Sequence, residues 1–89
     1  MQTILKFILD EQDDQTVVLP KGYKILSIGE QEGKLTMWVM VNTDSPTTEC
    51  YIRIYGTCHS IRQVMGYENI YLGTVMMSSG LVWHLFELK

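Results

Sequence analysis

The chain has 89 residues, of which 46% are hydrophobic and 19% are charged, and its formal net charge is −3. This length predicts one domain over residues 1–89, and the hydrophobic content excludes intrinsic disorder. The acidic balance argues against sequence-independent nucleic-acid binding, which needs a clustered basic surface.

Apolar and polar residues alternate with a period of two along most of the chain, which is typical of β-strands. Residues 59–66 lack this alternation, and Ile61, Val64 and Met65 lie there at helical spacing. We therefore expect at most one short helical turn in that segment. The expected strands are 3–9, a strand ending at 16–19, then 24–31, 34–42, 48–56, 69–77 and 81–88.

Turn residues separate the expected strands. The segments 20–22 and 31–34 and the triplet 78–80 contain the proline, glycine and serine that favour tight turns, and 42–48 reads as a polar loop. The strand 34–42 is apolar on both faces, which predicts a central position or an interface. The fold class that follows is all-β, a small antiparallel sandwich or rolled barrel of six or seven strands.

We expect a cytoplasmic protein. The first ten residues lack the basic start and the long apolar run of a signal peptide. Residues 69–86 carry no charge, but Gly73 and Gly80 interrupt them, and their alternation favours a hairpin over a membrane span. The two cysteines, Cys50 and Cys58, are too few for a secreted disulfide scaffold, which predicts a reducing compartment.

Few residues offer catalytic or metal chemistry. His84 lies in a strand, where a histidine is more often structural, and Cys58 and His59 are adjacent, so their side chains point in opposite directions. Neither a Cys-x-x-Cys spacing nor a pair of histidines at metal-binding spacing is present. We therefore predict a protein that is not an enzyme and has neither a cofactor nor a metal site.

A binding surface is a better candidate. Tyr51, Arg53 and Tyr55 share one face of their strand, where tyrosine rings offer stacking surfaces and arginine offers a planar fork for phosphate or carboxylate. The alternative is ordinary cross-strand packing of these side chains. The loop that follows adds a glycine, two hydroxyls and an imidazole that are able to face a small anion, namely Gly56, Thr57, Ser60 and His59.

A second candidate surface is acidic. Four carboxylates lie within five positions, at Asp10, Glu11, Asp13 and Asp14. Such a patch is able to mimic nucleic acid in front of the basic cleft of a partner protein. Most acidic runs of this kind are solvated turns, and that interpretation stays open.

Methionine and tryptophan are numerous for so short a chain, with six and two residues. Methionine suits adaptable contact surfaces, and more apolar residues lie on two-faced strands than a thin core needs. We therefore expect a homo-oligomer.

The segment Ile52-Arg53, Gly56-Thr57, His59 and Ile61 resembles the Ile-Arg-x-x-Gly-Thr-Gly-His-Pro-Ile signature of a small uncharacterised family. Members of that family are short proteins common in tailed-phage and prophage genomes. Two residues depart from the signature: Cys58 replaces its glycine and Ser60 its proline. Cys58 argues against a tight left-handed turn at that position. The resemblance extends to Pro20, Gly22, Ile25-Leu26-Ser27, Gly73-Thr74, Val82, His84, Phe86 and Glu87.

The resemblance implies a phage accessory protein that acts in the cytoplasm of a bacterial host, often against host defence. Two mechanisms of stoichiometric binding remain open. An oligomer holds a small anionic signalling nucleotide through the tyrosine–arginine face, or the acidic turn blocks a host defence enzyme. A third possibility is a minor structural or assembly protein.

Overall fold

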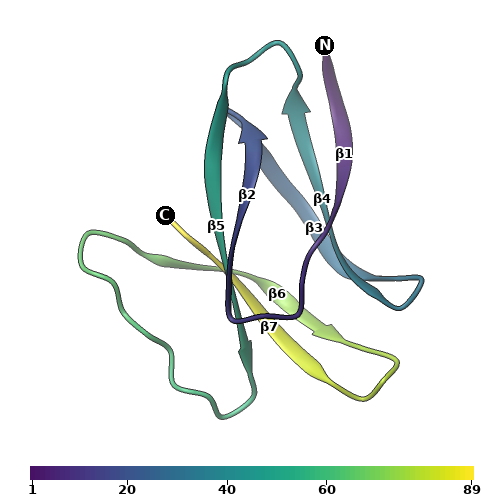
Figure 1. Cartoon of the computed structure of the whole chain (residues 1–89), viewed down its shortest axis with the longest axis vertical. Helices are drawn as coiled ribbons and strands as arrows, with labels where there is room; N and C mark the ends of the chain where they lie inside the picture. Colours follow the sequence, from purple (N-terminus) through teal and green to yellow (C-terminus); the bar gives the residue numbers. More distant parts are fainter.

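The structure is a computed structural model that describes all residues 1–89, and it is built from antiparallel strands alone. In Figure 1 the two strands nearest the C-terminus run obliquely across the others. The all-β prediction is confirmed, with seven strands in two sheets. The strands are β1 (Gln2–Ile8), β2 (Asp14–Pro20), β3 (Lys24–Gln31), β4 (Lys34–Asn42), β5 (Thr47–Gly56), β6 (Asn69–Met76) and β7 (Val82–Leu88).

One sheet has three strands in the order β1-β4-β3, and the other has four in the order β2-β5-β7-β6. The doubly apolar strand β4 lies in the centre of the smaller sheet, as its sequence predicts. The two sheets also meet at one edge, where β3 lies against β6. At that meeting Gly73 leaves room for Ile28, whose Cδ1 would be 3.1 Å from a Cβ on the glycine.

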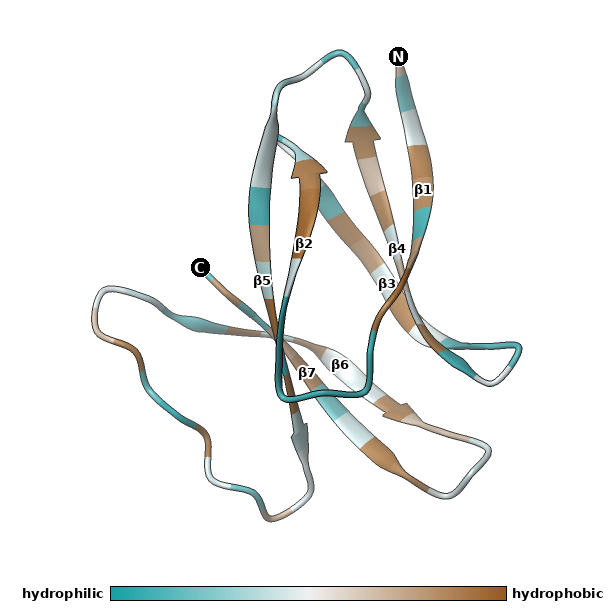
Figure 2. Cartoon of the chain, in the orientation of Figure 1, coloured by the Kyte–Doolittle hydropathy of each residue, from teal (hydrophilic) through white to brown (hydrophobic).

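The core lies between the sheets, and alternate residues of β4 and β5 supply most of it. On β5 the residues Cys50, Ile52 and Ile54 are buried, which confirms the inner face expected from alternation. Figure 2 shows that the connection between β1 and β2 is hydrophilic, whereas the strands carry the hydrophobic residues. The main core cluster is Leu9, Leu19, Leu35, Met37, Val39, Val41, Cys50, Ile52, Ile54, Val75, Met77 and Leu85.

A polar contact also lies inside this core. The Tyr23 hydroxyl, just before β3, donates a hydrogen bond to the buried Glu87 carboxylate of β7. The Cys50 thiol lies 3.7 Å from the same carboxylate. Burial raises the pKa of Cys50 to about 11 and raises the pKa of Tyr23 as well. Both groups therefore keep their protons at neutral pH, and the bond from Tyr23 to Glu87 links the two sheets.

Residues 57–68 form a wide loop between β5 and β6 that contains no helix. No helical turn forms there, which agrees with the expectation of at most one. Ile61 and Met65 are exposed, so an amphipathic turn would have no apolar surface to pack against, and Gly66 has a positive φ of 85°. No helix in the structure is long and apolar enough to span a membrane.

Candidate functional site

The outer face of the four-stranded sheet carries most of the chain's chemically versatile side chains. Because directly opposed residues share a face, the strand register arranges these side chains in rows across the sheet. One row runs Asp14, Arg53, Phe86, Tyr71 across β2, β5, β7 and β6. The neighbouring rows are Tyr55, His84, Thr74 on one side and Thr16, Tyr51, Leu88, Asn69 on the other.

One carboxylate serves two arginines in this face. Asp14 Oδ1 lies 3.1 Å from Arg53 Nε, and its two oxygens accept bonds of 3.0 and 3.2 Å from the guanidinium of Arg62. The bonds that Arg62 donates to Asp14 raise the pKa of the Arg62 guanidinium. The three groups together carry one net positive charge. Arg53 is nearly covered, with 12% of its side chain exposed, whereas Arg62 is 46% exposed.

The 57–68 loop is fastened over this cluster. Arg53 Nη1 donates a 2.9 Å bond to the Arg62 carbonyl, which also accepts a 3.1 Å bond from Asn69 Nδ2. The Arg62 backbone N–H donates to the Tyr55 hydroxyl at 3.3 Å, and its guanidinium lies 5.5 Å from the Tyr55 ring centre. Arg53 therefore positions the loop in addition to carrying charge.

The position of Tyr55 limits its availability. Alternation places it on the outer face with Tyr51 and Arg53, yet only 4% of it is exposed because the loop covers it. Its ring packs edge-on against Phe86 at 5.6 Å. Phe86 in turn packs against Tyr71 at 5.4 Å, and Tyr71 is 58% exposed. The exposed aromatic surface of this row is therefore Tyr71.

His84 joins the start of the loop to β6. Its Nε2 lies 2.8 Å from the Thr57 hydroxyl, and its Nδ1 lies 2.9 Å from the Thr74 hydroxyl. Thr74 Oγ1 is also 2.6 Å from the hydroxyl of Tyr71. Both ring nitrogens of His84 are thus engaged, and a continuous polar chain leads from Thr57 to the exposed tyrosine.

Residues 56–59 form a tight turn, closed by a 3.2 Å bond from the His59 N–H to the Gly56 carbonyl. Cys58 has a φ of 72°, so it adopts the left-handed conformation that the sequence argued against. The His59 ring lies over Gly56, where an added Cβ would be 3.0 Å from Cε1. Ser60 is exposed and follows this turn.

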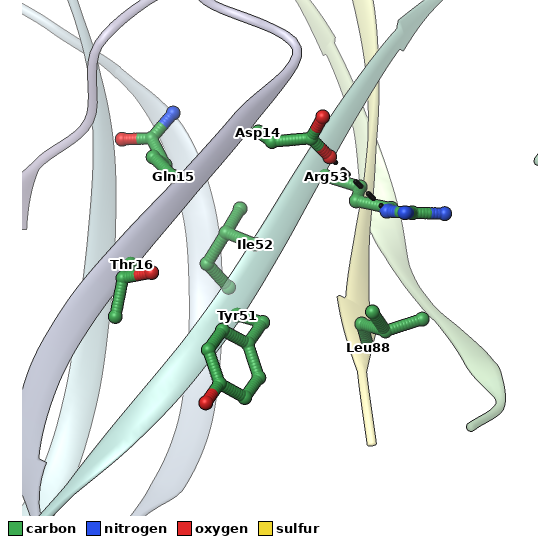
Figure 3. Close-up of a pocket in the computed structure, with 7 residues that line it drawn as sticks. All are labelled: Asp14, Gln15, Thr16, Tyr51, Ile52, Arg53 and Leu88. Atoms are coloured by element: carbon green, nitrogen blue, oxygen red, sulfur yellow. Dashed lines mark ion pairs between the residues drawn. The ribbon is translucent and has the colours of Figure 1, made fainter. Parts of the chain in front are cut away.

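A shallow hollow of about 270 Å³ lies beside the arginine cluster. Figure 3 shows Tyr51 and Leu88 on one side of it and the paired Asp14 and Arg53 at its upper end. This volume is slightly below the usual range for ligand pockets, so the hollow suits only one part of a small ligand. Its lining residues are Asp14, Gln15, Thr16, Tyr51, Ile52, Arg53 and Leu88.

The chain is matched over residues 1–89 by the model of one protein family, described as a domain of unknown function, DUF7352. The chain belongs to this family. No curated protein and no solved structure shows significant similarity to the chain.

The acidic turn of this DUF7352 protein uses its carboxylates within the chain. Glu11 accepts a 2.7 Å bond from the indole of Trp83, and Asp10 accepts a 3.1 Å bond from Gln12. Asp14 is paired with the two arginines. The side chain of Asp13 is exposed, and its carbonyl accepts a bond from Ile54. The turn therefore has fewer unpartnered carboxylates than its sequence suggests.

Sequence reasoning missed part of this face. It selected Tyr51, Arg53 and Tyr55 from one strand, and the structure adds Arg62, Tyr71, Thr74, His84 and Phe86 from the loop and two further strands. A β-bulge between Tyr71 and Gly73 lets Tyr71 and Thr74 point to the same side. A strict period of two would instead group Tyr71 with Gly73.

Proposed function

We propose that this DUF7352 protein is a non-enzymatic phage accessory protein that binds a small nucleotide on the outer face of its four-stranded sheet. The supporting observation is that two guanidinium groups share one carboxylate on the same face as an exposed, ring-backed tyrosine. Phosphate matches the residual positive charge, and a base matches the tyrosine ring.

Each part of a nucleotide has a partner in this proposal. Arg62 is the exposed member of the charged cluster, so it meets the phosphate, while the nearly covered Arg53 holds the loop. Tyr71 stacks on the base, with Phe86 supporting the ring from the side. The hydroxyls of Thr74 and Tyr71 lie next to that ring and provide hydrogen bonds to base or sugar.

Holding a nucleotide requires binding alone, so the proposed function needs no nucleophile, general acid or metal ion. A phage protein that holds a nucleotide in this way lowers the free concentration of a signalling molecule in its host. The resemblance of residues 52–61 to phage proteins supports that setting. The acidic turn supports the rival inhibitor mechanism less well, because most of its carboxylates already have partners within the chain.

The first experiment measures thermal unfolding against a panel of mono-, di- and cyclic nucleotides. A ligand at one hundred times its dissociation constant stabilises the fold by about 2.7 kcal/mol, which shifts the melting temperature by several degrees. We expect a selective shift for at least one anionic nucleotide. The absence of any shift across the panel would contradict the proposal.

Paired variants locate the site. Tyr71→Leu removes the ring and should abolish the shift, whereas Tyr71→Phe keeps the ring and should retain most of it. Arg62→Gln should weaken binding, and Lys24→Gln on the other sheet should not. Unfolding of each variant without ligand checks that its fold is intact. Equal shifts for Tyr71→Leu and Tyr71→Phe would place the ligand elsewhere.

A further inference from the structure

The four edge strands of the two sheets differ in how they avoid pairing with other chains. The edge strand β2 ends in Pro20 and begins with Asp14. The edges of β3 and β6 each contain a bulge and lie against one another. In contrast, β1 has seven residues with no proline, glycine or bulge and one charge, Lys6. Such an edge is open to a further strand.

The hydrogen bonds of β1 show which main-chain groups are free. The Thr43 N–H donates to the Met1 carbonyl, and the Leu9 N–H donates to the Leu35 carbonyl. Hydrogen-bonded positions alternate along an antiparallel pair, so the odd-numbered residues of β1 bond to β4. The N–H and C=O groups of the even-numbered residues, from Gln2 to Ile8, therefore point away from the sheet at its free edge.

At this edge a side chain that points to the inner face, Leu5, is also left partly exposed to solvent. It is opposite Val39, which is fully buried in the core, so both point to the inside of the molecule. Leu5 nevertheless remains 37% exposed. On the outer face of the same strand Ile4 and Ile8 are also exposed. A strand added beside β1 would cover side chains on both faces.

We propose that a second copy of this chain occupies the edge, with the two β1 strands antiparallel about a two-fold axis at Leu5. In this register Leu5 meets its symmetry mate, Ile4 meets Lys6 of the other copy, and Gln2 meets Ile8. The free even-numbered residues then form the hydrogen-bonded pairs of the new ladder. The two three-stranded sheets become one continuous sheet.

The sequence of β1 favours this register over its neighbours. Centring on Leu5 pairs all of the residues from Gln2 to Ile8, whereas any shift leaves one end unpaired. Centring on Lys6 would place the two ammonium groups directly opposite each other, which is destabilising. In the register centred on Leu5, each Lys6 lies beside an isoleucine that its aliphatic stem can cover. This self-complementarity selects a second copy as the partner.

Sedimentation velocity tests the dimer. We expect a species of about twice the chain mass of 10.3 kDa. Proline at position 6 removes a donor from the free edge without removing one from the β1–β4 ladder, so Lys6→Pro should be monomeric. Lys6→Ala removes the same side chain and should remain dimeric. A wild-type monomer at every concentration would overturn the proposal.

Two further variants decide the matter if Lys6→Pro does not fold. Leu5→Lys places like charges at the two-fold axis and should give a folded monomer, so an unchanged dimer would overturn the proposed interface. In a Cys58→Ser background, Leu5→Cys should form a disulfide-linked dimer on mild oxidation, because opposed residues at such positions have Cα atoms about 4.5 Å apart. Val18→Cys on β2 is the exposed control. Equal rates for the two cysteines would also count against β1.

Discussion

The outer faces of the two sheets are unlike each other. The face of the four-stranded sheet holds a charged cluster, a row of aromatic rings and a histidine bonded to two threonines, and the 57–68 loop folds over part of it. The face of the three-stranded sheet has one hydrogen bond between two side chains, from Lys6 to Gln31, beside exposed apolar residues such as Ile4 and Ile8. This difference underlies the two proposals, which place a polar ligand on the outer face of the four-stranded sheet and a second copy of the chain at the β1 edge of the other sheet.

The largest expected effect comes from Tyr55, which supports the covered part of the polar face. Tyr55→Ala removes a buried ring and its bond to the Arg62 backbone, and it should lower the free energy of unfolding by about 3 kcal/mol. Tyr51→Ala, two residues away on the same face but exposed, should cost less than about 1 kcal/mol. Urea unfolding measures both. Equal losses would mean that the loop does not bury Tyr55.

The second largest effect on stability is expected from Asp14, which pairs with both arginines of the polar face. Asp14→Asn leaves two guanidinium groups without their carboxylate and should cost about 1–2 kcal/mol, reduced by the partial exposure of Arg62 and Asp14. The neighbouring exposed Asp13 is a matched control, and Asp13→Asn should stay within about 0.5 kcal/mol. Chemical denaturation at low salt reads out the difference. If the two variants behave alike, the arginine cluster contributes nothing to stability.

Raising the pH into the alkaline range tests the buried groups of the interior rather than the residues of the two outer faces. The folded protein raises the pKa of Cys50 from 9.0 to about 11, so its stabilising contribution is present below pH 9 and is lost as pH rises through that interval. The raised pKa of Tyr23 acts in the same direction at higher pH. Stability should therefore fall from about pH 9 to 11. Cys50→Ala should flatten this decline, and a variant of the exposed Cys58 should not, as unfolding midpoints across that range would reveal.

The smallest effect concerns the turn that begins the loop. Gly56→Ala places a methyl group against the His59 ring, and because a flexible side chain is able to move, the cost should be within about 0.5 kcal/mol. The proton resonances of the His59 ring should nevertheless shift, since the ring must leave its position over the glycine. Gly73→Ala meets Ile28 with a φ of 148° and should cost more. An unmoved His59 resonance would place the imidazole elsewhere.

The strands of this fold could be predicted because their side chains alternate and because Gly22, Gly33 and Gly80 stand in the turns between them. The order of the strands within the two sheets could not be predicted, because strand pairing joins segments that are far apart in the chain. The turn at Cys58 also differed from expectation, because the Gly56–His59 bond and the Thr57 contact to His84 hold a non-glycine residue in a left-handed conformation.

The candidate site could be predicted only in part, again because it joins segments that are far apart in the chain. The alternation of side chains along the strand predicted that Tyr51, Arg53 and Tyr55 share one face. It could not predict that Arg62, in the 57–68 loop, pairs with Asp14 and covers Tyr55. Whether these residues bind a ligand stays a prediction. The bulge that brings Tyr71 beside Thr74 is a local departure from alternation, so this pair was invisible to a pattern search.

The most direct test of the proposed nucleotide-binding face is chemical-shift mapping of the ¹⁵N-labelled protein with the nucleotide that gives the largest thermal shift. We predict that the perturbed amides cluster around Arg62, Tyr71 and Thr74, while those around Ile4 and Ile8 remain unchanged. Perturbations confined to the three-stranded sheet, or none at saturating ligand, would contradict the account.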